Sequence, residues 1–309
     1  MSYAIRGNVL IENVDANRAE WLARRKDTVG SSEIVTVCGL NKYQTPLELW
    51  AQKTGKVPEV EENEFMRLGR HMEPFIGELF ARETGMIVRP ANTLYGHPEL
   101  DWATASPDFF CQADAMGELE IVEAKNVSVY RHAEYEDGNL PNGPHMQVVW
   151  QLGVLGLQGG YVAALVGAAP NNFYKPHIEY SAELFDQMVG LADKFIENVR
   201  RDIPPEARGS DKKLLESLLV RDPEKEIDLP EQAGKLLNEY FEADKMRVSA
   251  TRTLEGYKMV LEDVQAKLMQ MMGDASIGHY GDAVVKVKKI VIAPFQNKGS
   301  SYTKITVKQ

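Results

Sequence analysis

Two oppositely charged side chains, Glu123 and Lys125, stand two residues apart in the segment ELEIVEAKNV. Alternate residues of a β-strand point to the same face of a sheet, so this carboxylate and this ammonium would share one site. Asp108 lies upstream in SPDFF, directly after a proline, and the polar segment QADAMGEL between the two strands predicts a β-turn. We therefore expect Asp108, Glu123 and Lys125 to meet.

Two carboxylates at one place are suitable ligands for a hard cation such as Mg²⁺, which prefers oxygen ligands and retains several waters. A cation held by Asp108 and Glu123 would activate water and stabilise charge on a phosphate, and a second ion would assist the leaving oxygen. Lys125 would reach the attacking water or the phosphate. This is the chemistry of phosphodiester hydrolysis, although the triplet alone is a weak pattern, and such residues more often form a solvated strand face.

Two flanking segments supply further polar groups. Glu73 lies in LGRHMEPF, on an expected helix just upstream, and offers a third carboxylate. Gln147 and Gln151 lie in HMQVVWQLG and fall on one face of an expected helix. An amide there would hold a metal-bound water or a substrate phosphate, or it would simply be exposed.

The elements that position these residues follow from the spacing of hydrophobic residues. Helices and turns are expected over about 17–55, and a long helix in FMRLGRHMEPFIGELFARETG is closed by Gly85. Further helices are expected over about 145–157 and 181–201. The expected strands lie in MIVRPANTLYG, WATASPDFFCQA, ELEIVEAKNV, YVAALVG and FYKPHIEYS. This order predicts an α/β layered core.

The composition shifts beyond residue 210, and we expect two domains, 1–209 and 210–309. The second is predicted to contain a helical region over 230–272, broken near Gly256, and a terminal β-hairpin in KVKKIVIAPF and SYTKITVK. The formal net charge of the chain is −10, which argues against a polyanionic partner. The segment after residue 273 nevertheless has six lysines against two acids. It is therefore either a basic binding segment on an acidic body or a strand edge protected by lysines.

The absence of several sequence features excludes some classes of protein. The 309 residues contain two cysteines, Cys38 and Cys111, too few for a disulfide framework or a cysteine-rich metal site. No apolar stretch approaches the roughly 18 residues that a membrane span needs, and the N-terminus lacks the apolar run of a secretory signal. We expect a reduced, cytoplasmic protein with no membrane partner.

Five ordered segments, WLARRKDTVGSSEI, LGRHMEP, SPD, EAK and HMQVVWQLGVLG, resemble the lambda-exonuclease/YqaJ-like viral recombinase family. That family lies in the PD-(D/E)xK, restriction-endonuclease-like superfamily, and the likeness runs from about Trp21 to Arg201. It implies a mixed central sheet flanked by helices, with a PD-(D/E)xK exonuclease domain over 1–209. The last hundred residues lie outside it, as an appendage for oligomerisation or for contact with DNA or a partner.

The resemblance also implies roles for single residues. Asp108 and Glu123 would be metal ligands, Lys125 the catalytic ammonium, and Glu73 a ligand near a second metal position. Gln147 matches the first glutamine of the family's helix, whereas Gln151 is spaced differently. The cofactor would be Mg²⁺, with Mn²⁺ as a substitute and two ions per site. Arg25 and Ser32 match an arginine and a serine that bind the 5′-terminal phosphate of the degraded strand, and a guanidinium fork suits a phosphate dianion. From the residues alone, Arg24 and Arg25 would be a charged helix surface.

Three functions are compatible with these features. The first is a metal-dependent 5′→3′ exonuclease that acts on double-stranded DNA ends and leaves a 3′ overhang for a single-strand annealing protein. The protein would be of phage or prophage origin and would act in a bacterial host. The family resemblance also implies a ring-shaped homo-oligomer, whose basic channel would reconcile the acidity of the chain with binding to DNA. The second is a structure-specific endonuclease of the same fold. The third is a non-catalytic scaffold that binds DNA ends during recombination.

Overall fold

The structure, a computed structural model, describes residues 5–58, 63–219, 224–292 and 300–308, with the backbone alone for 289–292 and 300–308. The chain divides into two units, Met1–Arg221 and Asp222–Gln309. The first unit contains all the expected site residues, and the second contains none of them. The two units are described separately.

A six-stranded mixed sheet forms the centre of the first unit. Its strands follow the order β2-β5-β6-β7-β8, and β9 also pairs with β7. β6 and β7 are parallel and the other neighbours are antiparallel. The strands are β2 (Ile87–Pro90), β5 (Phe109–Gln112), β6 (Glu120–Val127), β7 (Gly159–Val166), β8 (Phe173–Tyr174) and β9 (His177–Glu179). This confirms the expected mixed sheet.

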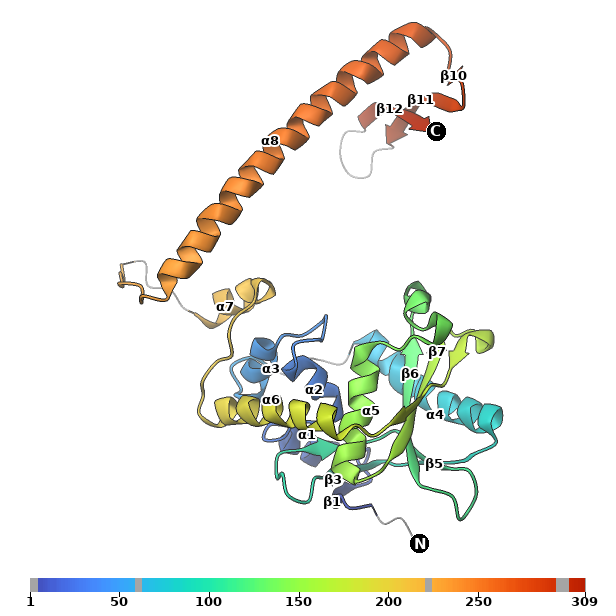
Figure 1. Cartoon of the computed structure of the whole chain (residues 1–309), viewed down its shortest axis with the longest axis vertical. Helices are drawn as coiled ribbons and strands as arrows, with labels where there is room; N and C mark the ends of the chain where they lie inside the picture. Colours follow the sequence, from blue (N-terminus) through green and yellow to red (C-terminus); the bar gives the residue numbers. More distant parts are fainter. Residues whose placement is uncertain (1–4, 59–62, 220–223, 293–299, 309) are drawn as a thin grey trace. The chain divides into compact units, whose positions relative to one another are not determined.

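The parallel pair requires a connection that crosses from one end of the sheet to the other, and α5 (Asn142–Leu155) supplies it. Figure 1 shows α5 lying against β6 and β7. Ile121 belongs to the hydrophobic cluster that includes α5, whereas Val122 and Ala124 belong to the cluster of α4 (Glu64–Thr84). Because side chains alternate along a strand, odd-numbered residues of β6 face α5 and even-numbered residues face α4.

Smaller elements complete the first unit. A three-stranded sheet in the order β1-β3-β4 is made of β1 (Asn8–Glu12), β3 (Thr93–Gly96) and β4 (Thr104–Ala105). The other α-helices are α1 (Arg18–Arg25), α2 (Ser31–Val37), α3 (Pro46–Lys53), α6 (Ala182–Arg200) and α7 (Lys212–Leu218). Short 3-10 turns are η1 (Val129–Glu134), η2 (Glu136–Gly138), η3 (Pro170–Asn172) and η4 (Gly209–Asp211). Of these strands, β1 was not expected from the sequence.

Helix ends follow the local chemistry of the sequence. The side chain of Asn63 accepts a hydrogen bond from the backbone of Met66 at the start of α4, and Gly85 ends that helix with a φ of 74°. A left-handed residue at this position favours glycine because it has no Cβ. At α3, Thr45 and Glu48 cap each other and Pro46 occupies the first turn.

The first unit extends beyond residue 209, where the sequence placed the boundary. Asp211 is fully buried and accepts hydrogen bonds from Thr45 Oγ1 at 2.5 Å and from the backbone nitrogen of Arg208 at 2.6 Å. Three leucines of α7 pack against the same hydrophobic cluster as α5: Leu214, Leu215 and Leu218. Residues 209–218 therefore belong structurally to the core that precedes them.

We predict that Asp211→Ala lowers the free energy of unfolding by about 1–3 kcal/mol, because the buried Thr45 hydroxyl loses its acceptor. The part-buried amide of Arg208 loses the same acceptor and adds a smaller effect. The control is Asp101→Ala, which removes an exposed carboxylate paired with Arg200 and should change stability by about 1 kcal/mol or less. Chemical denaturation of the two variants measures the difference, and equal effects would contradict the assignment.

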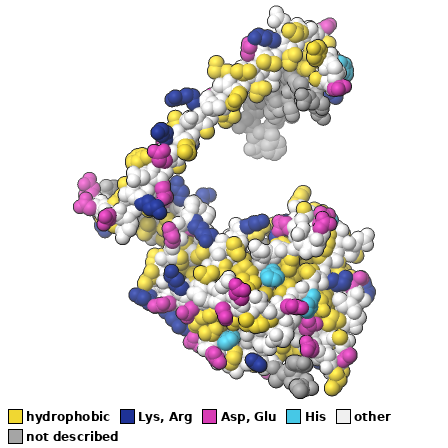
Figure 2. Space-filling model, in the orientation of Figure 1, with side chains coloured by type: hydrophobic (Ala, Val, Ile, Leu, Met, Phe, Trp, Pro, Cys, Tyr) yellow, Lys and Arg dark blue, Asp and Glu magenta, His cyan; other side chains and the backbone are white. Residues whose placement is uncertain are grey.

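The second unit is built on one long helix, α8 (Ala233–Met272), followed by β10 (Ile277–Tyr280), β11 (Ala283–Ile292) and β12 (Ser300–Lys308). β11 and β12 pair antiparallel, which confirms the terminal hairpin, and β10 adds an unexpected third strand. The expected break near Gly256 is wrong, since one glycine costs a helix only about 1 kcal/mol. Hydrophobic side chains remain exposed along α8 (Figure 2). Among the described residues, no helix is long and apolar enough to cross a membrane.

Candidate active site

The β5–β6 hairpin brings Asp108, Glu123 and Lys125 together. Phe109 pairs with Val122 across the hairpin, so Asp108 lies beside the middle of β6. Its Oδ2 accepts a hydrogen bond of 2.7 Å from the backbone nitrogen of Ala124. Lys125 Nζ donates to Glu123 Oε1 at 2.6 Å, with Glu123 buried and Lys125 half-buried. The hairpin pairing and the two-residue spacing thus place two acids and one amine in one cluster.

Glu73 reaches this cluster from α4, a different layer of the fold. Burial raises the pKa of Glu73, and the nearby charge of Glu123 raises it further, while Lys125 lowers it. The same pattern holds for Asp108: burial, then Glu123 and Glu73, raise its pKa well above the ordinary value. Three carboxyl groups therefore lie close enough to destabilise one another's charge.

Lys125 responds in the opposite direction. Burial lowers its pKa, but the carboxylates of Glu123 and Asp108 outweigh burial and hold the pKa above the ordinary value. The amine is therefore fully protonated at neutral pH. One ammonium does not balance three ionised carboxylates, so the cluster would carry an excess of negative charge once all three are deprotonated, and the raised pKa values of Asp108 and Glu73 reflect that cost.

This charge excess is the property expected of a site for a divalent cation. In the present side-chain conformations, no three His, Cys, Asp or Glu side chains among the described residues form a ready-made set of metal ligands. The reason is visible in the contacts: Asp108 is engaged by Ala124, and both oxygens of Glu123 are engaged by protein donors. The donor set nevertheless fits Mg²⁺ in kind, being made of carboxylate oxygens with uncompensated charge.

Gln151 occupies the position opposite Glu123. Its Nε2 donates to Glu123 Oε2 at 2.8 Å and to Ser31 Oγ at 3.2 Å, and the side chain is fully buried. Its Oε1 is buried and has no hydrogen-bond partner in the described part of the chain. A buried acceptor without a donor is costly, so a water or a hydrated ion beside Glu123 would satisfy it.

The structure thus gives Gln151 the contact for which Gln147 was the stronger expectation. Gln147 is half-buried one helical turn earlier, and its side chain makes no hydrogen bond to another described residue. Both glutamines share a helix face, so helical spacing alone could not rank them. Ser31, which the sequence interpretation passed over, contacts Gln151, whereas Ser32 is exposed.

We predict that Gln151→Ala lowers cleavage activity about 10–100-fold, the usual effect of removing a group that orients a metal ligand. Without its Nε2, Glu123 Oε2 loses a donor and the carboxylate is free to turn. Gln187→Ala on the exposed side of α6 serves as the matched control. Initial rates on linear duplex DNA at saturating Mg²⁺ provide the measurement, and wild-type rates for both variants would exclude an orienting role.

Arg25 is held at the edge of the same region. Its Nη2 and Nε donate to Glu33 Oε1 at 2.8 and 3.3 Å, and its guanidinium lies 4.7 Å from the centre of the Trp21 ring. About a third of the side chain, 36%, remains exposed. Glu33 also accepts from the backbone nitrogen of Gly30, the residue before Ser31. One chain of contacts therefore joins Arg25 to Glu123 through Gly30, Ser31 and Gln151.

Comparison with known proteins gives a similar family and a similar fold. Residues 20–158 match the family model of the YqaJ-like viral recombinase domain. The uncharacterized protein YqaJ of Bacillus subtilis (strain 168) is 36% identical over 186 residues, which cover 59% of this chain and 56% of that protein. The chain thus spans little more than half the length of this relative.

Two solved structures share the fold. An alkaline exonuclease, LHK-Exo from Laribacter hongkongensis, superposes with a TM-score of 0.50 at 22% identity, over 60% of this chain and 94% of that chain. LHK-Exo in complex with dAMP superposes with a TM-score of 0.51 at 22% identity, over 64% and 98% of the two chains. The resemblance seen in the sequence is confirmed: residues 20–158 are similar to the YqaJ-like viral recombinase domain, and the mixed sheet flanked by helices is the fold of these exonuclease structures.

Proposed function

We propose that this chain, with its YqaJ-like domain at residues 20–158, is a metal-dependent exonuclease that degrades double-stranded DNA from its 5′ ends. The observation that carries the proposal is the cluster of Asp108, Glu123 and Lys125 on the β5–β6 hairpin, with Glu73 beside it. The pKa values of Asp108 and Glu73 are raised in part by neighbouring carboxylates, so these acids lie close enough to share a cation that would favour their ionised forms, with the protonated amine of Lys125 beside them. The fold shared with an alkaline exonuclease supports the same class of reaction.

Each residue has a part in hydrolysis. Asp108, Glu123 and Glu73 would hold Mg²⁺, or Mn²⁺ in its place, in one or two positions, and bound ions would supply the activation of water and charge stabilisation. Lys125 remains protonated beside Glu123 and would donate to the scissile phosphate or to the attacking water. Gln151 keeps Glu123 oriented, and its buried Oε1 would accept a hydrogen bond from that water.

The direction of digestion rests on Arg25 and Ser32. Arg25 presents an exposed edge of a guanidinium that is fixed by Glu33 and Trp21, and such a group binds phosphate oxygens. Exposed Ser32 would add a hydroxyl donor. A 5′-terminal phosphate held there would place the first phosphodiester bond toward Glu123, so that the strand is shortened from its 5′ end.

The test uses linear duplexes with labelled ends that carry a 5′-phosphate, a 5′-hydroxyl or a closed hairpin. We expect mononucleotide release from 5′-phosphate ends with Mg²⁺, slower release from 5′-hydroxyl ends, and none with EDTA. Cleavage of closed ends at the same rate would favour the alternative, a structure-specific endonuclease of the same fold. Binding of DNA ends without cleavage in either Mg²⁺ or Mn²⁺ would favour a non-catalytic scaffold.

The wider role would be resection of DNA ends in phage-type recombination within the cytoplasm of a bacterial host. The exposed 3′ strand would pass to a single-strand annealing protein. A ring-shaped homo-oligomer would let a protein of net charge −10 present a basic channel to DNA while its outside stays acidic. Residues 222–309 are the proposed contact for assembly, DNA or the annealing partner. Mass measurement of the full chain, with and without those residues, tests the assembly.

A further inference from the structure

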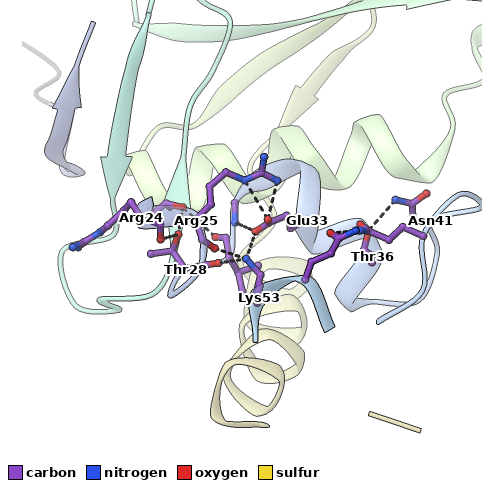
Figure 3. A network of polar contacts seen from close by, with 12 residues as sticks. Arg24, Arg25, Thr28, Glu33, Thr36, Asn41 and Lys53 are labelled. Atoms are coloured by element: carbon purple, nitrogen blue, oxygen red, sulfur yellow. Dashed lines mark hydrogen bonds and ion pairs between the residues drawn. The ribbon is translucent and has the colours of Figure 1, made fainter. Parts of the chain in front are cut away.

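Behind Arg25 lies a lysine that the proposed reaction does not use. The side chain of Lys53, at the end of α3, is only 4% exposed, which is unusual for a lysine. Its Nζ donates to three oxygens: the backbone carbonyl of Arg25 at 2.5 Å, the carbonyl of Thr28 at 2.7 Å, and Glu33 Oε2 at 2.9 Å. Figure 3 shows Glu33 between the Arg25 guanidinium and the Lys53 ammonium.

The contacts require Lys53 to be charged. Burial lowers its pKa, and the carboxylate of Glu33 partly offsets that effect. An uncharged amine has two protons to donate, whereas three acceptors surround Nζ, so all three hydrogens of the ammonium are used. Glu33 is likewise ionised: burial raises its pKa, but Lys53 and Arg25 together bring it below the ordinary value.

The charges of the three side chains have a simple consequence. Arg25 and Glu33 alone would form a neutral pair, and a neutral pair attracts a phosphate dianion weakly. Among these three side chains, Lys53 restores a net charge of one positive unit without occupying the exposed edge of the guanidinium; the carboxylate of Asp27 also acts on Lys53, but Asp27 is exposed and its charge is screened by solvent. Lys53 also donates to the backbone carbonyl of Arg25 and to Oε2 of Glu33, the carboxylate whose other oxygen orients the Arg25 guanidinium.

We infer that Lys53 and Glu33 are positioning residues for a terminal phosphate: Glu33 sets the direction of the Arg25 guanidinium, and Lys53 supplies the charge that Glu33 would otherwise cancel. This inference rests on the proposed function, in which Arg25 binds the 5′-phosphate. It adds that the preference for a phosphorylated end depends on a side chain that never touches DNA.

The test compares Lys53→Met with the control Lys56→Met. Lys56 lies three residues further along, and its ammonium pairs with Asp202 outside this network. kcat and KM are measured on duplexes with 5′-phosphate and 5′-hydroxyl ends. For Lys53→Met, we expect KM on 5′-phosphate ends to rise about tenfold, the effect of weakening one charge-assisted hydrogen bond, with little change on 5′-hydroxyl ends. Lys56→Met should match the wild type.

The ratio of kcat/KM on the two ends separates positioning from a loss of folded protein, because unfolding lowers both rates equally. Lys53→Gln, which retains two amide hydrogens but no charge, provides a second variant if Lys53→Met does not fold, and should lose the preference as well. Inorganic phosphate should inhibit digestion of 5′-phosphate ends by the wild type more strongly than by either variant. If both variants keep the wild-type preference for 5′-phosphate ends, the inference about Lys53 is wrong and the proposed function stands. Equal wild-type rates on both ends overturn the proposed function and this inference with it.

Discussion

Replacing Asp108 by asparagine is expected to reduce Mg²⁺-dependent DNA cleavage by about 10³-fold or more. The carboxylate would share a cation with Glu123 and Glu73, and charge stabilisation by a bound metal is worth several kcal/mol at the transition state. Asparagine keeps an oxygen that can accept the hydrogen bond from Ala124, so the hairpin should remain folded. Single-turnover cleavage of a labelled duplex, read against Mg²⁺ concentration, measures the loss.

The control for this variant is Asp114→Asn, which makes the same change at an exposed carboxylate in the turn of the same hairpin. Cleavage should be unaffected there. If Asp108→Asn retains wild-type rates at saturating Mg²⁺, the hydrolytic assignment of this cluster is wrong.

Asp108→Asn should lower cleavage activity, but it should make the stability of the metal-free protein less sensitive to rising pH. The pKa values of Asp108 and Glu73 are raised by burial and by like charge. The folded, metal-free protein therefore holds these protons to higher pH than the unfolded chain. The protonated Asp108 and Glu73 contribute their full stabilisation below the ordinary carboxyl pKa of about 4. This stabilisation is lost as the pH rises through the raised pKa values of the folded protein. We expect metal-free Asp108→Asn to lose less stability over that range, which thermal unfolding across pH measures.

Arg25→Ala is expected to lower the rate of digestion from 5′-phosphate ends about 10²-fold, because truncating one partner of a charge-assisted pair costs roughly 2–5 kcal/mol. It would also leave Glu33 with Lys53 and Gly30 as its partners, a neutral arrangement with no group facing the phosphate. Digestion from 5′-hydroxyl ends should change little, since that strand end brings no dianion to the pocket.

Arg24→Ala supplies the matched control on the preceding residue. Figure 3 shows the Arg24 side chain pointing away from Glu33, and its exposed position leaves it outside the network. Its removal should preserve the discrimination between the two kinds of end. Equal losses on both ends for Arg25→Ala would show that Arg25 supports the fold and does not recognise phosphate.

Much of the first unit follows from patterns that act over short distances. The two-residue spacing of Glu123 and Lys125 and the expected hairpin before β6 were enough to bring Asp108 to the same place, because alternation fixes the face of each side chain and antiparallel pairing of consecutive strands fixes their neighbours. The long helix α4 and its end at Gly85 follow from hydrophobic spacing and from the preference of glycine for a left-handed backbone.

Contacts between distant segments were beyond that kind of reasoning. Lys53 stands twenty residues after Glu33, and a lysine before Thr-Gly at a helix end has the appearance of an ordinary exposed cation. Gln151 was ranked below Gln147, since only the packing of α5 on the sheet decides which of the two faces Glu123. The strand β1 was not expected because it has one buried residue, Ile11, and its partner β3 lies far along the chain.

The hydrogen bond between Thr45 and Asp211 spans 166 residues, and this separation has a consequence for the protein during its synthesis. Ribosomes add about 5–20 residues per second, so Thr45 would be added to the chain roughly 10–30 s before its acceptor. The start of α3 and the hydrophobic surface later covered by the leucines of α7 stay uncovered throughout that interval. Nascent chains stalled before residue 211 should accordingly be the form most readily bound by chaperones or cut by proteases.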